Sequence, residues 1–296
     1  MPTPAETLDP ILLAGLEGLE LRARTLVDGY LAGQHRSAGR GYSAEFAEHR
    51  EYAPGDDPRY VDWKIYGRTD KFFLKQFEAE SDLVCTLAVD ASESMTYRSR
   101  PAALSKWEVA QCLAAALAHL VLRNRDRVGL AVFDDQLRHW MPASNRPALG
   151  EQLIGVLERT SCGGKSSIGS ALHELAGRLR QRGVVVVFSD LLDEVETLLA
   201  GLKHLRYQRH EVIVLQLLDP AELDFPFQRT VRFQGLESAG DELVQLPGMR
   251  QAYLAAMKKF LRQVHAGCRA GQVDYQLVGT DASPVIALKR LLMRRP

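Results

Sequence analysis

The stretch from Leu83 to Met95, LVCTLAVDASESM, constrains the fold of this chain more than any other part of it. Val84 to Val89 is a short, largely apolar run of branched residues without glycine or proline, and Asp82 and Asp90 bound it. Such a run is typical of a strand that is buried on both faces, as the central strands of a parallel sheet are. The chain is therefore predicted to build an α/β domain around this strand.

Strand and helix patterns alternate from residue 81 onward, which indicates a mainly parallel sheet covered by helices. The further strands are expected at Arg127–Phe133, Leu137–Trp140 (returning beside it), Val184–Phe188, Val212–Leu218 and Val273–Val278. Helices are expected after a capping box formed by Ser105 and Glu108, at Leu149–Leu157, at Ile168–Leu179 (closed by Gly183), at Glu194–Leu205, at Tyr253–Val264 and at Pro284–Arg294.

Residues 9–31 have the pattern of one amphipathic helix. Asp9 is a suitable N-cap and Pro10 a suitable first helical residue. The apolar stripe consists of Leu12, Leu16, Leu19, Ala23, Leu26 and Tyr30. We expect this helix to pack on the domain's own surface; docking to a partner is the alternative.

Gly33 to Glu80 is dense in arginine, acidic and aromatic residues and has little apolar periodicity. Arginines alternate with carboxylates there, a pattern that favours bidentate ion pairs. Two interpretations remain open: an internal clasp of salt bridges, or a surface that faces a partner. The residues in question are Arg50, Tyr52, Asp56, Asp57, Arg59, Asp62, Trp63 and Arg68. Phe72–Phe77 is expected to be a strand.

These patterns predict a domain organisation. Residues 1–80 comprise the N-terminal helix and the Arg/Asp-rich segment, packed on the main domain. Residues 81–296 form that α/β domain, with residues 225–248 as a hairpin insertion.

Charge and composition exclude several classes of partner. Lys+Arg and Asp+Glu each number 37 in 296 residues, so the chain has no electrostatic footprint for nucleic acid or an anionic membrane. No secretory signal is apparent, and the longest apolar run, Val184–Phe188, is too short to span a bilayer. The four cysteines are scattered without a CxxC pair, which favours free thiols in a reducing compartment. We expect a cytoplasmic protein without a membrane span.

Three stretches carry oxygen ligands to one edge of the predicted sheet. Asp90-x-Ser92-x-Ser94 follows the central strand, Ser189-Asp190 follows Val184–Phe188, and Ser166 lies in the glycine-containing loop from Gly163. The carboxyl ends of parallel strands meet in the ligand-binding crevice of such a sheet. We therefore predict that one Mg²⁺, or Mn²⁺ or Ca²⁺, is bound by Asp90, Ser92, Ser94, Ser166 and Asp190. Under the alternative interpretation these residues only cap a turn and a helix.

Signatures of catalysis are incomplete. Gly164-Lys165-Ser166 resembles the end of a P-loop, but Arg159 stands where that motif needs glycine. The histidines show no HExxH pattern, and no GxSxG elbow occurs. We expect no catalytic residues. A metal-dependent phosphohydrolase that uses Asp90 is the alternative, although aspartyl-phosphate chemistry requires a second acidic residue at the position of Ser92.

Asp90-x-Ser92-x-Ser94, the loop hydroxyl and Asp190 resemble the metal-ion-dependent adhesion site of von Willebrand factor A domains. Ser166 stands where those domains usually have threonine. The resemblance implies a metal ion with a position open to a partner's carboxylate.

The Arg/Asp-rich segment before the central strand resembles one particular family. Its motif runs Arg50-x-Tyr52-x-x-Gly55-Asp56-Asp57-x-Arg59-x-x-Asp62-Trp63-Lys64, followed by Arg68 and Glu78-x-Glu80. This motif resembles the bacterial family called domain of unknown function 58, in which it precedes a von Willebrand A-like domain. The resemblance covers roughly residues 33–220. It implies a doubly wound, mainly parallel α/β sheet of the Rossmann type. It also implies partnership with MoxR-type AAA+ ATPases in chaperone-like assemblies, and with other von Willebrand A-like proteins.

We therefore expect a non-enzymatic, metal-dependent interaction module that works as an adaptor or co-chaperone. Besides the phosphohydrolase, a metal-free structural subunit that binds through the Arg/Asp-rich segment is an alternative.

Overall fold

The computed structural model describes residues 9–37, 50–51, 66–67, 71–74, 83–227, 231–233, 242–244 and 249–293. The chain divides into two compact units, residues 1–35 with 83–296, and residues 36–82. In the smaller unit, β1 (Arg50–Glu51) pairs antiparallel with β2 (Phe73–Leu74), inside the range predicted as a strand. Of Arg50 only the backbone is described. The other candidates of the Arg/Asp-rich segment lie outside the described residues: Tyr52, Asp56, Asp57, Arg59, Asp62, Trp63 and Arg68.

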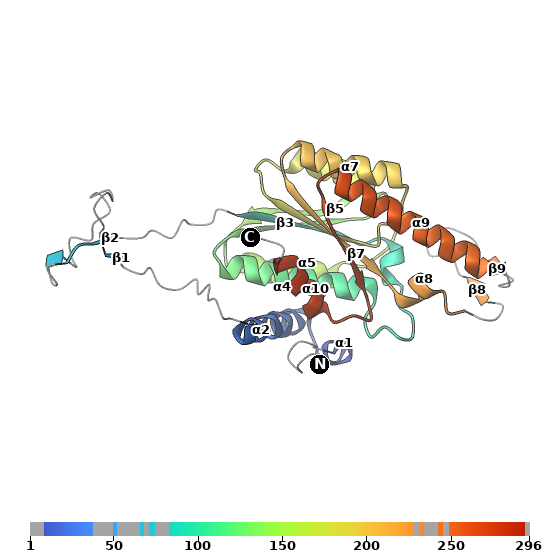
Figure 1. Ribbon diagram of the computed structural model, residues 1–296, viewed down its shortest axis with the longest axis horizontal. Coiled ribbons are helices and arrows are strands. Elements are labelled where there is room, and N and C mark those ends of the chain that lie inside the picture. The colour runs from blue at the N-terminus through green and yellow to red at the C-terminus, as the bar shows by residue number, and fades with distance from the viewer. Residues whose placement is uncertain are drawn as a thin grey trace. The chain divides into compact units, whose positions relative to one another are not determined.

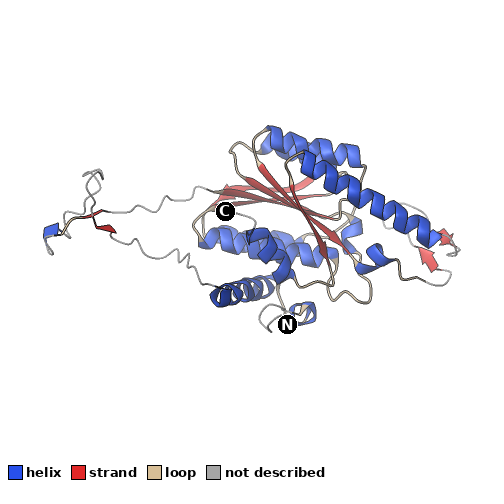
Figure 2. Cartoon of the chain, viewed as in Figure 1, coloured by secondary structure: helices blue, strands red, loops and turns tan. Residues whose placement is uncertain are grey.

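The larger unit is built on a six-stranded sheet with the order β10-β7-β6-β3-β4-β5 (Figures 1 and 2). Neighbouring strands run parallel except β5, which is antiparallel to β4. The strands are β3 (Val84–Asp90), β4 (Arg127–Phe133), β5 (Leu137–Ser144), β6 (Val184–Ser189), β7 (Glu211–Leu218) and β10 (Asp274–Gly279). The predicted doubly wound, mainly parallel α/β fold is thereby confirmed. Every residue of β3 is buried, as its apolar run predicts.

Helices cover both faces of this sheet (Figure 1). One face packs against α4 (Lys106–Arg123), α5 (Ala148–Arg159), α10 (Pro284–Met293) and the N-terminal helices. The other packs against α6 (Ile168–Arg178), α7 (Val195–Tyr207) and α9 (Met249–Ala270). Alternate residues of β3 serve the two cores: Leu87 and Val89 face the first, and Ala88 faces the second.

The N-terminal region differs from the single helix that we predicted. It forms α1 (Pro10–Ala14), capped by Asp9 as expected, and a separate α2 (Leu19–Ser37). Gly15 caps the first helix, and Gly18 adopts a left-handed φ of +84° that a continuous helix cannot contain. The stripe shifts with this break, because Leu12 is 65% exposed and Leu13 is buried instead.

Two other local predictions need correction. Gly183 does not close α6, which ends at Arg178; it directly precedes β6, where a Cβ would collide with the Val84 carbonyl. No helix was predicted directly after β7, yet a short α8 (Pro220–Asp224) lies there.

The C-terminal region joins the main sheet, as predicted, because β10 pairs in parallel with β7. The expected hairpin insertion is represented by β8 (Val231–Phe233) and β9 (Glu242–Val244), which pair antiparallel. None of the described helices is both long and apolar enough to cross a membrane.

Candidate metal-ion site

The candidate site lies where the order of the sheet reverses. From β3 the chain first adds β4 on one side and returns later to add β6 on the other. In sheets of this kind, ligands bind at the carboxyl ends of the strands beside such a switch point. Asp90 ends β3 and Asp190 directly follows β6, and both are completely buried.

The Asp90 carboxylate is held by the turn that follows it. Its Oδ1 accepts a hydrogen bond from the backbone N–H of Ser92 (2.8 Å), and its Oδ2 accepts one from the Ser189 hydroxyl (2.6 Å). Burial, together with the nearby Asp190 carboxylate, raises the pKa of Asp90 to about 7, although the hydrogen bonds from Ser189 and Ser92 act to lower it. Asp90 is therefore a fixed carboxylate whose negative charge is poorly compensated.

The two serines of the motif connect the carboxylates. The hydroxyls of Ser92 and Ser94 lie 3.1 Å apart, and the Ser94 hydroxyl donates to Oδ2 of Asp190 at 2.7 Å. Ser94 belongs to a short 3-10 helix, η2 (Glu93–Thr96), which begins directly after Ser92. Four of the five predicted ligands thus belong to one hydrogen-bonded cluster, in which Asp90, Ser92 and Asp190 are buried and Ser94 is half-buried.

The loop of the fifth ligand, Ser166, is attached to the same turn. The Gly163 N–H donates to the carbonyl of Ala91 (3.0 Å), and the Glu93 N–H donates to the carbonyl of Gly164 (3.2 Å). The Ser166 hydroxyl is buried without a hydrogen-bond partner, whereas the neighbouring Ser167 hydroxyl donates to Ser170. Buried hydroxyls normally have a hydrogen-bond partner. Of Ser166 and Ser167, Ser166 is therefore the serine whose hydroxyl is available to bind an ion.

The structure adds a residue that the sequence analysis missed. Lys106, the first residue of α4, is completely buried, and its ammonium lies 2.7 Å from Asp190 Oδ2 and 2.7 Å from Glu222 Oε1. A lysine at a helix N-terminus is opposed by the helix dipole. Its position directly after the Ser105 capping residue is therefore unfavourable for a buried ammonium unless acidic groups lie nearby.

Glu222 and Asp219 form the outer part of the cluster on α8. They make a reciprocal capping box, whose Asp-Pro-x-Glu pattern was readable in the sequence. Burial raises the pKa of Glu222. Burial alone would lower the pKa of Lys106, but the Asp190 and Glu222 carboxylates outweigh it and raise that pKa.

The donor set fits a hard divalent cation. Asp90 and Asp190 are the two carboxylates of the predicted ligand set; with Asp219, Glu222 and the one ammonium of Lys106, the cluster has a formal charge of −3 when all are ionised. Among the described residues no three His, Cys, Asp or Glu side chains form a metal-binding group, so the predicted set relies on serine hydroxyls beside the two aspartates. Carboxylate and hydroxyl oxygens suit Mg²⁺ better than zinc or copper.

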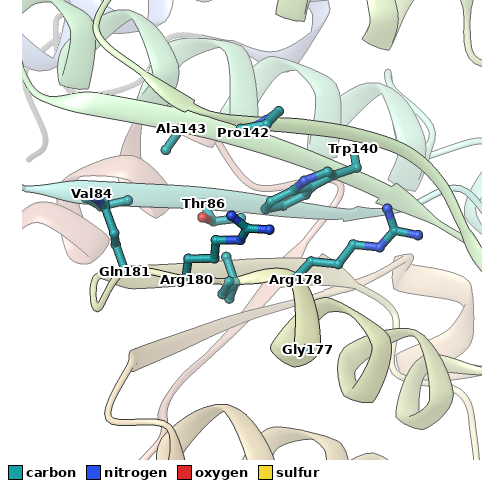
Figure 3. Close-up of a pocket in the computed structure, with 10 residues that line it drawn as sticks. Val84, Thr86, Trp140, Pro142, Ala143, Gly177, Arg178, Arg180 and Gln181 are labelled. Carbon is teal, nitrogen blue, oxygen red and sulfur yellow. The ribbon is translucent and has the colours of Figure 1, made fainter.

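A separate cavity of about 570 Å³ lies near the start of β3, at the opposite end of that strand from Asp90 (Figure 3). Val84 and Thr86 of β3 and Trp140 of β5 line it. Arg178 and Arg180 extend from the end of α6 towards these strands. None of the predicted ligands lines this cavity, so it is distinct from the candidate site.

Comparison with solved structures finds domains of low sequence identity. The conserved hypothetical protein BatB from Bacteroides thetaiotaomicron is 18% identical, with a TM-score of 0.49 over 72% of this chain and 98% of that one. The SpRpn10 VWA domain is 12% identical, with a TM-score of 0.40 over 72% of this chain and 95% of that one.

Sequence comparison gives closer relatives. The uncharacterized proteins Rv1480 of Mycobacterium tuberculosis and Mb1516 of Mycobacterium bovis are each 31% identical over 235 residues, which cover 78% of this chain and 72% of theirs. Residues 48–263 match the family described as "Protein of unknown function DUF58". That match includes residues 48–80 of the Arg/Asp-rich segment and the strands that carry the candidate site, and the chain belongs to this family.

Proposed function

We propose that this chain is a non-enzymatic protein-interaction module whose binding depends on a divalent cation, with Mg²⁺ as the expected ion. The observation that carries the proposal is the buried cluster at the ends of β3 and β6. It combines two buried aspartates and two hydrogen-bonded serines, and the loop attached to the same turn adds the buried, unpartnered hydroxyl of Ser166. Such a cluster is costly to bury unless a cation compensates it.

Asp90, Ser92, Ser94, Ser166 and Asp190 would hold the ion, directly or through water. When bound, the ion would offer a coordination position to a carboxylate of the partner. The protein's part is to fix the ligands: Ser92 N–H and the Ser189 hydroxyl orient Asp90, and the Leu192 N–H orients Asp190 at 3.1 Å. A preorganised shell reduces the entropy lost when a partner binds.

For the partner we propose a MoxR-type AAA+ ATPase, with this chain as an adaptor or co-chaperone. Other von Willebrand A-like proteins are a further class of partner. The support for both is the family resemblance of the Arg/Asp-rich motif together with the acidic site.

A capture experiment tests this function. The full chain is immobilised and presented with a purified MoxR-type ATPase from the same organism, in Mg²⁺ and then in EDTA. Retention by the wild type in Mg²⁺ alone, and its loss in Asp90→Ala, is the expected result. Equal retention in all four conditions would reject metal-bridged binding.

One observation favours a second candidate, a metal-free structural subunit. The Lys106 ammonium already neutralises part of the cluster by pairing with Asp190 and Glu222. In that case the Arg/Asp-rich segment would provide the interface. Arg59→Glu would then abolish capture while Asp90→Ala would not, with circular dichroism of each variant as the folding control.

A further inference from the structure

Lys106 lies between the candidate metal site and α8 and contacts a carboxylate on each side. Its ammonium is 2.7 Å from Asp190 Oδ2 on one side and 2.7 Å from Glu222 Oε1 on the other. The Lys106 and Asp190 side chains have no exposed surface, and that of Glu222 is 15% exposed. The ammonium is thus an internal cation that two carboxylates share.

Asp190 has little remaining capacity to accept further interactions. Its Oδ2 accepts from both Lys106 and the Ser94 hydroxyl, and its Oδ1 accepts from the Leu192 N–H. A carboxylate has about four lone-pair sites, and a cation beside it competes with the ammonium for the same negative charge. A divalent ion that draws on Asp190, even through water, must therefore weaken the Lys106–Asp190 pair.

Glu222 is placed to keep the ammonium when that pair weakens. Its Oε2 accepts from the Asp219 N–H at 2.7 Å, and its backbone carbonyl accepts from the Tyr253 hydroxyl at 2.9 Å. These contacts fix Glu222 from α8 and α9 independently of Asp190. The Glu222 carboxylate therefore stays within reach of the Lys106 ammonium even when Asp190 interacts with a metal ion.

We propose that Lys106 is a built-in competitor of the divalent cation, which sets the metal affinity of the site, and that Glu222 is the acceptor that holds the ammonium when the metal is bound. This inference rests on the proposed metal dependence. Both residues act through Asp190 and are positioning residues, not metal ligands.

The test is isothermal titration calorimetry of Mg²⁺ and of Mn²⁺ into the full chain. The variants are Lys106→Met, Glu222→Gln and the double variant. Removing the competing charge is expected to tighten binding by about tenfold or more. Glu222→Gln is expected to weaken binding in the wild type, because the ammonium then depends on Asp190 alone. In the Lys106→Met background the same change should alter the affinity less than about twofold.

A matched control separates local competition from general electrostatics. Lys165, beside Ser166, is exposed, so Lys165→Met should change the affinity by no more than about threefold because solvent screens its charge. If Lys106→Met fails to fold, the double variant compared with Glu222→Gln measures the same removal of the ammonium. Circular dichroism monitors the fold of each variant.

The outcomes distinguish this inference from the function on which it rests. Metal binding by the wild type that Lys106→Met leaves unchanged overturns the competitor role and spares the proposed function. An equal effect of Glu222→Gln in both backgrounds overturns the acceptor role of Glu222. Binding only after removal of Lys106 supports the competitor role but overturns the proposed metal dependence, because the ammonium then takes the place of the metal in the wild type. Absence of binding in every variant overturns both proposals.

Discussion

The Lys106 ammonium and the Asp190 carboxylate lie 2.7 Å apart with no solvent contact, although 84 residues separate them in the sequence. The pair joins the first turn of α4 to the end of β6, beside the switch point of the sheet. Breaking a buried ion pair by removing one partner leaves an uncompensated charge. The same residues therefore bear on both stability and cation binding, and the two roles have to be measured separately.

Removal of Lys106 should destabilise the metal-free protein strongly. We expect Lys106→Met to lower the free energy of unfolding in EDTA by about 3–5 kcal/mol, because Asp190 and Glu222 lose their shared cation. Urea unfolding followed by circular dichroism measures the change. The double variant with Glu222→Gln should recover part of the loss. A loss below about 1 kcal/mol in the single variant would show that the pair is not coupled to folding.

Ser166 should separate stability from binding. Because its buried hydroxyl has no hydrogen-bond partner, Ser166→Ala should leave the metal-free stability unchanged or raise it by up to about 1 kcal/mol. The same change should weaken Mg²⁺ binding by at least about tenfold. Ser167→Ala is the matched control, since that hydroxyl donates to Ser170, and it should not affect binding. Equal effects of the two variants on Mg²⁺ affinity would remove Ser166 from the ligand set.

Gly169 should be indispensable for the packing of α6 on α7. A Cβ at this position would lie 2.6 Å from the carbonyl oxygen of Thr197, so Gly169→Ala forces the two helices apart. We expect a loss of about 1–3 kcal/mol in urea unfolding. On the same helix, a Cβ at Gly177 would have no neighbouring atom within 4 Å, so Gly177→Ala should be neutral or mildly stabilising. A similar loss in both variants would instead indicate a general cost of alanine in this helix.

His210 should make the fold sensitive to acid. This residue follows α7 and is 3% exposed, and burial lowers the pKa of its imidazole, partly offset by a hydrogen bond to the Gly183 backbone. Between neutral pH and about pH 5 the unfolded chain takes up a proton at His210 that the folded protein resists, so the contribution of His210 to the free energy of unfolding falls as the pH falls. The raised pKa of Asp90 acts in the opposite direction over this range, because the folded protein takes up that proton before the unfolded chain does.

Urea unfolding at pH 7.5 and at pH 5.5 measures this dependence. The free energy of unfolding at pH 7.5 minus that at pH 5.5 should shift to a lower value in His210→Gln than in the wild type, because the His210 contribution is removed and the opposing Asp90 contribution stays. His119→Gln, at an exposed position on α4, is the control and should keep the wild-type difference. If His210→Gln also keeps it, the acid sensitivity comes from other groups.

Local patterns were sufficient to predict most of the sheet. In β3 and in β6 the apolar run and the aspartate at its end are contiguous in the sequence, so the run predicts each strand. Because the carboxyl ends of parallel strands meet at one edge of a sheet, the same pattern predicts that Asp90 lies near Asp190. The break at Gly15 and Gly18 was overlooked because the apolar spacing continues across it. A left-handed glycine interrupts a helix without interrupting the pattern.

Lys106 and Glu222 could not be found in the same way. They are 116 residues apart, and their meeting depends on how α4 and α8 pack around the sheet. Only the unfavourable position of Lys106 at a helix start hinted at buried acids. Buried charge pairs of this kind are set by tertiary structure, and a single sequence shows their members without their pairing.

The most direct test of the central claim is calorimetric titration of Mg²⁺ into the EDTA-treated full chain, wild type and Asp90→Ala, with the exposed Asp135→Asn as control. We expect one ion per chain for the wild type and for Asp135→Asn, and no binding for a folded Asp90→Ala. A wild-type chain that binds no Mg²⁺, or an Asp90→Ala variant that binds it equally well, would contradict a metal site at Asp90.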